Sequence, residues 1–126
     1  NILAGAIDDC LVCNGEYIVV DFKTRGFELK EDSTAYYQNQ LDCYALLLER
    51  NGHKHPGFAY LVYYIPKEVQ DNGQVQFDVQ VKKMNVSPAR ALRTFNDAIK
   101  LLDGKRPKKH SECKFCAWAD DEWKWE

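Results

Sequence analysis

The chain has 126 residues, of which 45% are hydrophobic and 29% are charged, and its formal net charge is −2. This length suits one domain with a real hydrophobic core and leaves no room for a second domain of ordinary size. The small negative charge excludes a uniformly basic nucleic-acid coat, so any contact with nucleic acid has to come from local patches or a metal ion. Five cysteines are an odd number, and no stretch resembles a signal peptide or a membrane span. We therefore expect free or metal-bound thiols in a reducing cytosol.

Two apolar runs joined by Asn14 and Gly15 predict a β-hairpin with strands over residues 2–13 and 16–24. If these two residues form the whole loop, the numbers of facing residues sum to 29. The register then decides which side chains share a face of the hairpin.

In this register Asp8 faces Asp21, and Lys23 lies on the same face two residues further on. Asp9 falls on the opposite face. Two converging carboxylates suit a hard cation such as Mg²⁺ or Mn²⁺, and an ordinary solvated hairpin is the equally weighted alternative. Because two such carboxylates repel each other without a cation, we expect Asp21→Asn to stabilise the metal-free protein.

Polar residues 25–33 predict a loop, followed by a helix over about 35–50 that Asp32, Ser33 or Thr34 can cap. The nearly all-apolar run 57–65 predicts a strand that is covered on both faces and ends at Pro66. The crossover rule makes this strand parallel to the second hairpin strand, either adjacent to it or one place away.

Alternating residues 74–81 predict a half-exposed antiparallel strand at a sheet edge. Ser87 and Pro88 open a second long helix that ends near Gly104. We expect its apolar stripe, which includes Leu102, to pack on the sheet. Arg90, Arg93 and Lys100 follow helical spacing and could bind phosphates, but a merely solvated helix face is the favoured interpretation.

Three motifs follow one another in the first half of the chain: Gly5-x-Ile7-Asp8, Val19-Val20-Asp21-x-Lys23-Thr24, and Gln40-x-x-x-Tyr44. This series resembles the PD-(D/E)xK nuclease superfamily, in particular its RecB-like branch with the CRISPR-associated and phage exonucleases. The resemblance implies an α/β fold with a mixed central sheet of about four strands flanked by helices, as in the restriction-endonuclease-like core. It also implies a metal-dependent DNA exonuclease that hydrolyses phosphodiester bonds in DNA recombination, repair, or phage or CRISPR DNA processing.

The resemblance also assigns roles to residues of this chain. The catalytic set that it implies is Asp8, Asp21, Lys23, Gln40 and Tyr44. Asp8, Asp21 and the backbone carbonyl of Phe22 would hold Mg²⁺ or Mn²⁺. Lys23 would position or activate the attacking water, while Gln40 and Tyr44 would steady the site or the DNA backbone.

In the resembled family a helix before the hairpin usually supplies a Glu or His, so we expect an upstream segment that completes the site. DNA is the expected substrate, a helicase or recombination protein a possible partner, and a bacterial, archaeal or phage-infected cytoplasm the expected location. No membrane contact is expected. The alternative is a non-catalytic module that binds DNA or a partner and carries a zinc-knuckle-like tail.

We place the nuclease core at residues 1–104 and a basic, cysteine-bearing tail at residues 105–126. The tail offers His110, Cys113 and Cys116 as metal ligands. A Zn²⁺ site or an iron–sulfur cluster would need further ligands from outside this chain. The basic cluster at residues 105–109 suits either a DNA backbone or a soluble linker. The tail tryptophans, Trp118, Trp123 and Trp125, are expected to pack at the core edge.

Overall fold

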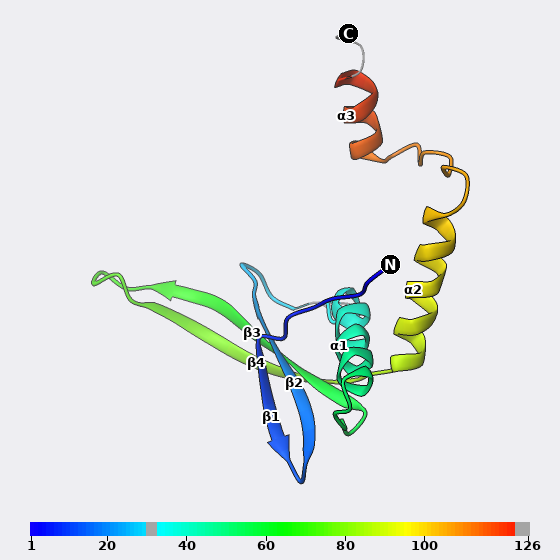
Figure 1. Ribbon diagram of the computed structural model, residues 1–126. Helices are drawn as coiled ribbons and strands as arrows, with labels where there is room; N and C mark the ends of the chain where they lie inside the picture. The colour runs from blue at the N-terminus through cyan, green and yellow to red at the C-terminus, as the bar shows by residue number, and fades with distance from the viewer. Residues whose placement is uncertain (30–32, 123–126) are drawn as a thin grey trace. The chain divides into compact units, whose positions relative to one another are not determined.

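The computed structural model of the protein describes residues 1–29 and 33–122. Its elements are β1 (Asp9–Cys13), β2 (Glu16–Thr24), a 3₁₀ turn (Ala35–Tyr37), α1 (Gln38–Arg50), β3 (Phe58–Val69), β4 (Val75–Asn85), α2 (Pro88–Leu102) and α3 (Lys114–Glu122) (Figure 1). The chain divides into two compact units, residues 1–95 and residues from 96 onward. Each unit is described by itself below.

The predicted hairpin register is confirmed, since Cys10 pairs with Val19 and Cys13 with Glu16. Asn14 and Gly15 have positive φ angles of 51° and 78°, as a type I′ turn requires. The first strand is shorter than predicted, because pairing begins at Asp9 and residues 2–8 are not in a strand. Asp8 therefore sits in a bend just before β1.

The four strands form one mixed sheet in the order β1-β2-β3-β4, which confirms the α/β fold class and the edge position of the strand predicted at 74–81. β3 is parallel and adjacent to β2, while β4 is antiparallel to β3. The prediction that Pro66 ends β3 is wrong, because the strand continues to Val69 after a register shift between Pro66 and Glu68. β2 pairs with β3 only as far as Tyr64. Beyond Tyr64, one side of β3 is an edge of the sheet, where a proline is tolerated because its missing N–H is not needed for pairing.

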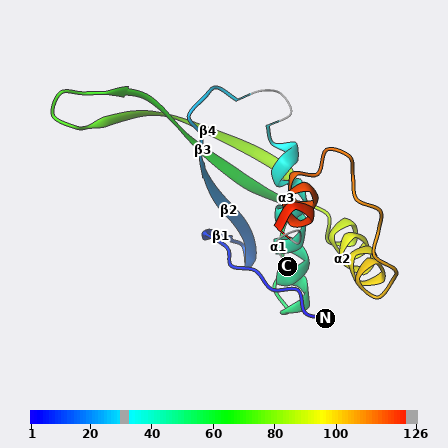
Figure 2. The ribbon, with the colours of Figure 1, turned by 90° about the horizontal axis from the view of Figure 1, so that it is seen from above.

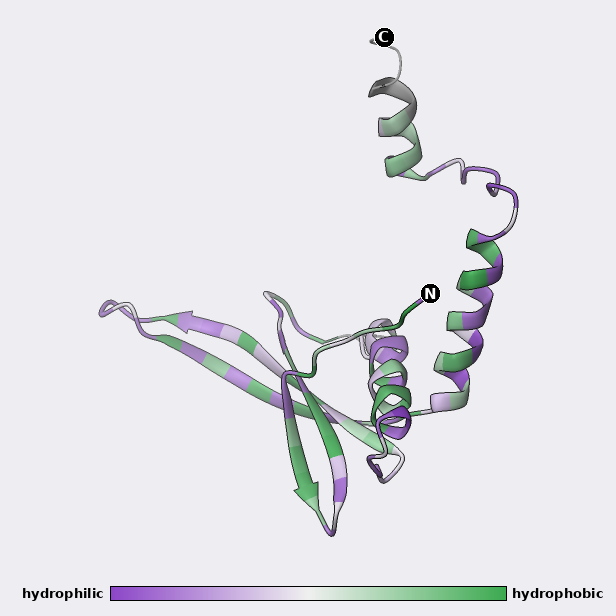
Figure 3. Cartoon of the chain, in the orientation of Figure 1, coloured by the Kyte–Doolittle hydropathy of each residue, from purple (hydrophilic) through white to green (hydrophobic). Residues whose placement is uncertain are grey.

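The core lies between α1 and one face of the sheet (Figure 2). Side chains of β2, α1 and β3 form it: Val19, Leu41, Ala59, Leu61, Tyr63 and Ile65. Burial alternates along β3, so the prediction that this strand is covered on both faces is wrong. The other face of the sheet leaves apolar side chains of all four strands exposed or half-buried: Leu11, Phe22, Val62, Val79 and Val81. Figure 3 shows that hydrophobic residues occur along each of these strands.

The helix predicted at 35–50 is present as the 3₁₀ turn followed by α1. Thr34 precedes the turn but makes no capping hydrogen bond with its side chain, so that capping prediction is wrong. Asp32, another capping candidate, lies outside the described residues. The start of α2 is as predicted: Ser87 Oγ accepts a hydrogen bond from the Arg90 N–H at 3.3 Å, and Pro88 is the first helical residue.

A buried carboxylate on α1 holds the first turn of α2. The Asp42 side chain has no solvent exposure, and it accepts hydrogen bonds from the Ser87 N–H at 2.9 Å and from Gln38 Nε2 at 3.0 Å. The Arg90 guanidinium forms an ion pair with the same carboxylate. Arg90 is thus a structural residue, which corrects both its interpretation as a phosphate ligand and its interpretation as part of a solvated helix face.

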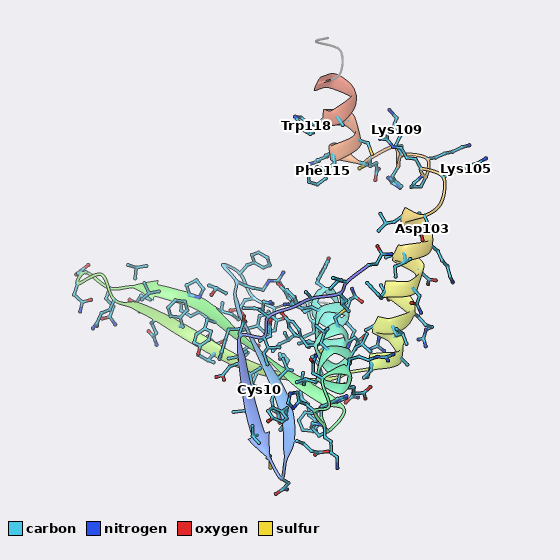
Figure 4. The ribbon with its side chains drawn as sticks, in the orientation of Figure 1. Cys10, Asp103, Lys105, Lys109, Phe115 and Trp118 are labelled. Carbon is cyan, nitrogen blue, oxygen red and sulfur yellow. The ribbon has the colours of Figure 1, made fainter. Side chains whose placement is uncertain are left out.

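The predicted core stripe of α2 is only partly present, because Ala91 is buried whereas Leu102 is exposed. In the unit from residue 96 onward, Phe115 and Trp118 of α3 are both exposed (Figure 4). Trp118 is 63% exposed, and its predicted packing at the core edge stays a prediction. The tail residues Trp123 and Trp125 lie outside the described part of the chain. None of the described helices combines the length and the apolar character that crossing a bilayer needs.

Candidate active site

Asp21 stands in the middle of β2 on the face that α1 covers, and only 1% of it is exposed. Its Oδ1 accepts a hydrogen bond from Gln40 Nε2 at 3.1 Å. Its Oδ2 lies 2.5 Å from Lys23 Nζ. A carboxylate buried this deeply is costly unless cations or donors surround it, and here both a lysine and an amide do so.

Lys23 follows Asp21 on the same face because side chains alternate along a strand. Its Nζ donates to Gln40 Oε1 at 3.3 Å and lies 4.6 Å from the centre of the Tyr37 ring. Tyr37 in turn meets the buried Tyr63 edge-on, with ring centres 6.2 Å apart. The ammonium group is thereby fixed on three sides: by a carboxylate, an amide oxygen and an aromatic face.

Gln40 joins the strand to the helix. Its Nε2 also donates to the Tyr44 hydroxyl, which is one helical turn further on, at 2.8 Å. The acid–lysine cluster, which we define as Asp21, Lys23, Gln40 and Tyr44, is therefore one continuous network across β2 and α1.

Asp8 reaches the same region through the backbone. Its Oδ2 accepts a hydrogen bond from the Phe22 N–H at 3.0 Å, so its carboxylate lies one residue from Asp21 in the strand. Asp9, assigned to the other face, instead accepts a hydrogen bond from the Cys10 N–H at 2.7 Å. The two neighbouring acids thus bind different backbone amides.

The carboxylates present suit a hard cation of the kind that keeps several water ligands. Mg²⁺ is commonly held by one or two protein carboxylates together with water and phosphate oxygens. Asp21 Oδ2 is buried and makes no hydrogen bond of good geometry to any described residue, and the Lys23 ammonium group compensates its charge. Within residues 1–29 and 33–122, no group of three or more His, Cys, Asp or Glu side chains is placed to hold a metal ion. Asp8 and Asp21 as the two side-chain ligands of a metal ion stay a prediction.

The three tail residues proposed as metal ligands do not form one group in the structure. His110 Nδ1 accepts a hydrogen bond from the Glu112 N–H at 3.2 Å. Cys113 precedes α3, and its Sγ accepts a hydrogen bond from the Cys116 N–H at 3.4 Å. This hydrogen bond is the main reason why the pKa of the Cys113 thiol is lowered.

Two side chains near the cluster were not singled out from the sequence. Tyr37 lies about one helical turn before Gln40 and so faces the same way. Arg25 continues the alternation of Asp21 and Lys23 along the strand. In both cases the spacing was a usable signal, and it was overlooked because a loop was expected from Arg25 onward.

Comparison with known proteins gives one result. The family model of the PD-(D/E)XK nuclease superfamily matches residues 2–120. Neither the curated proteins nor the solved structures contain a significant match to the chain.

Proposed function

This chain belongs to the PD-(D/E)XK nuclease superfamily, and from that premise we propose that it hydrolyses phosphodiester bonds of DNA with the help of Mg²⁺ or Mn²⁺. In this reaction the oxygen of a water molecule bonds to phosphorus, while the bond from phosphorus to the leaving oxygen of the sugar breaks. The RecB-like branch and an exonuclease mode of action remain predictions.

One observation supports this proposal most strongly: a buried aspartate and a lysine, two residues apart on β2, are locked together by a glutamine of α1. An acid-x-Lys triplet has little weight alone, because this chain contains four of them at Asp21, Glu28, Glu112 and Glu122. Among the described residues, only the Asp21 triplet combines a buried carboxylate with a second acid bound to the next backbone amide. Such a concentration of charge inside a fold is typical of a functional site.

The side chains of the cluster divide the work between them. Lys23 is placed to orient the attacking water and to donate a hydrogen bond to the phosphate as negative charge develops on it. Gln40 holds both Lys23 and Asp21, and the Tyr44 hydroxyl fixes the orientation of the Gln40 amide. Because these side chains are already held in position, little of their movement has to occur during the reaction, which lowers its barrier.

Asp8 and Asp21 would hold the metal ion. When bound, it would neutralise charge on the phosphate and help a water molecule to lose a proton. Occupancy by a cation also suits Asp21 Oδ2, the buried oxygen without a hydrogen bond.

The test is cleavage of end-labelled linear DNA by the purified chain with Mg²⁺, with Mn²⁺, and with EDTA. We expect cleavage with either metal and none with EDTA, and loss of cleavage in Asp21→Asn. The matched control is Asp9→Asn, because Asp9 is an exposed neighbour whose carboxylate bonds only to the adjacent amide. Metal-dependent cleavage that survives Asp21→Asn would place the chemistry elsewhere.

The exonuclease prediction has its own comparison. A circular duplex without ends should resist the protein under conditions in which the same duplex, once linearised, is degraded. Cleavage of both forms at similar rates would indicate an endonuclease. If DNA is bound but never cleaved in any metal, the non-catalytic binding module is favoured instead.

A further inference from the structure

A second basic side chain lies beyond the acid–lysine cluster, where β2 ends. Arg25 directly follows the last strand residue, and its N–H donates to the Tyr64 carbonyl at 3.1 Å. The backbone therefore remains extended against β3 at this point. Alternation then directs the Arg25 side chain to the α1 side of the sheet, like Asp21 and Lys23.

The Arg25 guanidinium is only partly compensated. Its Nη1 is buried, and among the described residues it has no hydrogen-bond partner. The group stacks over the Phe27 ring, 4.7 Å from its centre. Its charge also acts on Tyr63: burial raises the pKa of the Tyr63 hydroxyl, and Arg25 works in the opposite direction. The guanidinium is thus close to the buried row of the sheet.

An unsatisfied buried donor of this kind is costly, and folded proteins rarely keep one without a reason. Three other basic side chains of the same unit have carboxylate partners: Lys23 with Asp21, Lys67 with Glu28, and Arg90 with Asp42. No ion pair of Arg25 is present in the described part of the chain. Arg25 as a whole is only half-buried, so part of its guanidinium group remains accessible, and such a planar donor group is suited to two oxygens of one phosphate.

We propose that Arg25 binds a backbone phosphate of the DNA next to the phosphate that is cleaved beside Lys23. This inference rests on the function proposed above and adds a substrate-binding residue to it. Residues two apart on a strand are about 6.6 Å apart, which is on the scale of the spacing between neighbouring phosphates of one DNA strand. Arg25 thus positions the substrate, whereas Lys23 acts at the reacting phosphate.

The experiment measures DNA affinity separately from cleavage. Binding of a fluorescein-labelled 20-nucleotide single strand, and of the matching duplex, is followed by anisotropy with Ca²⁺ in place of Mg²⁺. Arg25→Gln should weaken binding about tenfold, the loss expected for a hydrogen bond to a charged group. It should also reduce the slope of log affinity against log salt concentration by about 0.7 to 0.9, the change for one lost phosphate contact.

Two further variants make the result specific. Arg25→Lys keeps the charge but not the paired donors, so it should retain most of the salt slope while losing part of the affinity. Arg93→Gln removes an exposed arginine of α2 and should bind as the wild type does. If Arg25→Gln lowers the melting temperature and leaves DNA affinity unchanged, Arg25 is a structural residue and the inference is wrong.

Steady-state cleavage separates this inference from the proposed function. We expect Arg25→Gln to raise KM about tenfold and to change kcat less than threefold. The lost contact would bind the substrate and the transition state equally, so its loss weakens binding and leaves the chemical step almost unchanged. A wild type that cleaves DNA together with an Arg25→Gln variant of unchanged KM contradicts the inference alone. A wild type that never cleaves, but binds DNA more tightly than Arg25→Gln does, contradicts the proposed nuclease activity and supports the inference.

Discussion

Lys23 Nζ lies 2.5 Å from Asp21 Oδ2, and the two side chains are 19% and 1% exposed. The buried carboxylate therefore already has a cationic partner without any metal ion. This ion pair changes the energetic argument for the site, because removing either charge leaves the other one buried and unpaired.

Lys23→Ala should abolish cleavage and also destabilise the fold. Although Lys23 lies outside the apolar layer, its ion pair with Asp21 makes it structural as well as functional. We expect a loss of about 2–3 kcal/mol in the free energy of unfolding, somewhat below the value for a fully buried pair because Lys23 is partly solvated. Urea unfolding monitored by circular dichroism measures this loss.

Lys67→Ala is the matched control for that measurement. Lys67 pairs with Glu28 on the surface, where the side chains are 41% and 69% exposed. Surface pairs contribute little, so we expect a change below about 1 kcal/mol. Equal losses in the two variants would show that the Asp21 pair is no more important than a surface pair.

Mg²⁺ or Mn²⁺ should raise the melting temperature of the wild type and have little effect on Asp8→Asn or Asp21→Asn. At a free metal concentration about 100 times the dissociation constant, binding adds about 2.7 kcal/mol to the free energy of unfolding. Asp8→Asn is the cleaner variant, since an asparagine oxygen still accepts the hydrogen bond from the Phe22 N–H. Scanning calorimetry with and without metal gives the shifts.

Without metal, Asp21→Asn should be less stable than the wild type. This reverses the sequence-based expectation, which considered only the repulsion between the two acids and not the pairing with Lys23. The same calorimetric scans in EDTA decide the sign, and a more stable Asp21→Asn variant would show that repulsion outweighs the ion pair.

Tyr37→Leu should lower kcat about tenfold with little change in KM, because the Tyr37 ring helps to fix the Lys23 ammonium. Tyr37→Phe keeps an aromatic face and should restore most of the rate. The neighbouring Tyr36 is exposed, so Tyr36→Leu serves as the control and should cleave normally. A Phe variant as slow as the Leu variant would point to the hydroxyl group instead.

Asp42→Ala should destabilise the unit formed by residues 1–95 by about 3 kcal/mol, since it removes a buried carboxylate that pairs with Arg90 and accepts the Ser87 N–H. Asp97→Ala, which breaks an exposed pair with Lys100, should cost less than about 0.5 kcal/mol. Chemical denaturation of both variants provides the comparison.

The Cys113 thiol should be alkylated by iodoacetamide with a pH midpoint below that of Cys10. The Cys116 N–H lowers the pKa of Cys113, whereas burial and then the charge of Asp9 raise the pKa of Cys10. A thiol with a lowered pKa is already thiolate at a lower pH, so its labelling begins earlier as the pH rises. Peptide mass spectrometry after timed labelling resolves the two sites.

Cys116→Pro tests the cause of that shift, because proline lacks the N–H and is tolerated in the first turn of a helix. The midpoint of Cys113 should rise in this variant and rise less in Cys116→Ser, which keeps the backbone donor. Equal midpoints in the two variants would assign the effect to the cysteine side chain.

The hairpin and its register were predictable because Asn14 and Gly15 determine the turn, and the turn determines every cross-strand pair. The parallel placement of β3 followed from the handedness of crossovers. Local backbone chemistry and topology rules were sufficient for these features. The sequence also grouped Asp21, Lys23 and Gln40, although the resemblance to a family contributed most to that choice.

The contacts that pass between elements were not predictable. The ion pair of Asp42 and Arg90 joins residues 48 positions apart, and no periodicity links them. The half-buried second face of β3 was not predictable, because an apolar run has the same pattern whether one face or both faces are covered. The continuation of β3 beyond Pro66 depends on where its neighbour β2 stops, which is a property of the sheet and not of the run itself.

The type I′ turn at Asn14 and Gly15 also has a consequence for the order in which the site assembles. A hairpin closed by two residues forms within microseconds, whereas the pairing of β2 with β3 joins Val20 to Tyr60 and has to close a long loop first. We therefore expect the segments that carry Asp8 and Asp21 to meet early in folding. The glutamine and tyrosine of α1 would reach them only with the late, non-local step, so cleavage activity should appear in refolding as the last signal to recover.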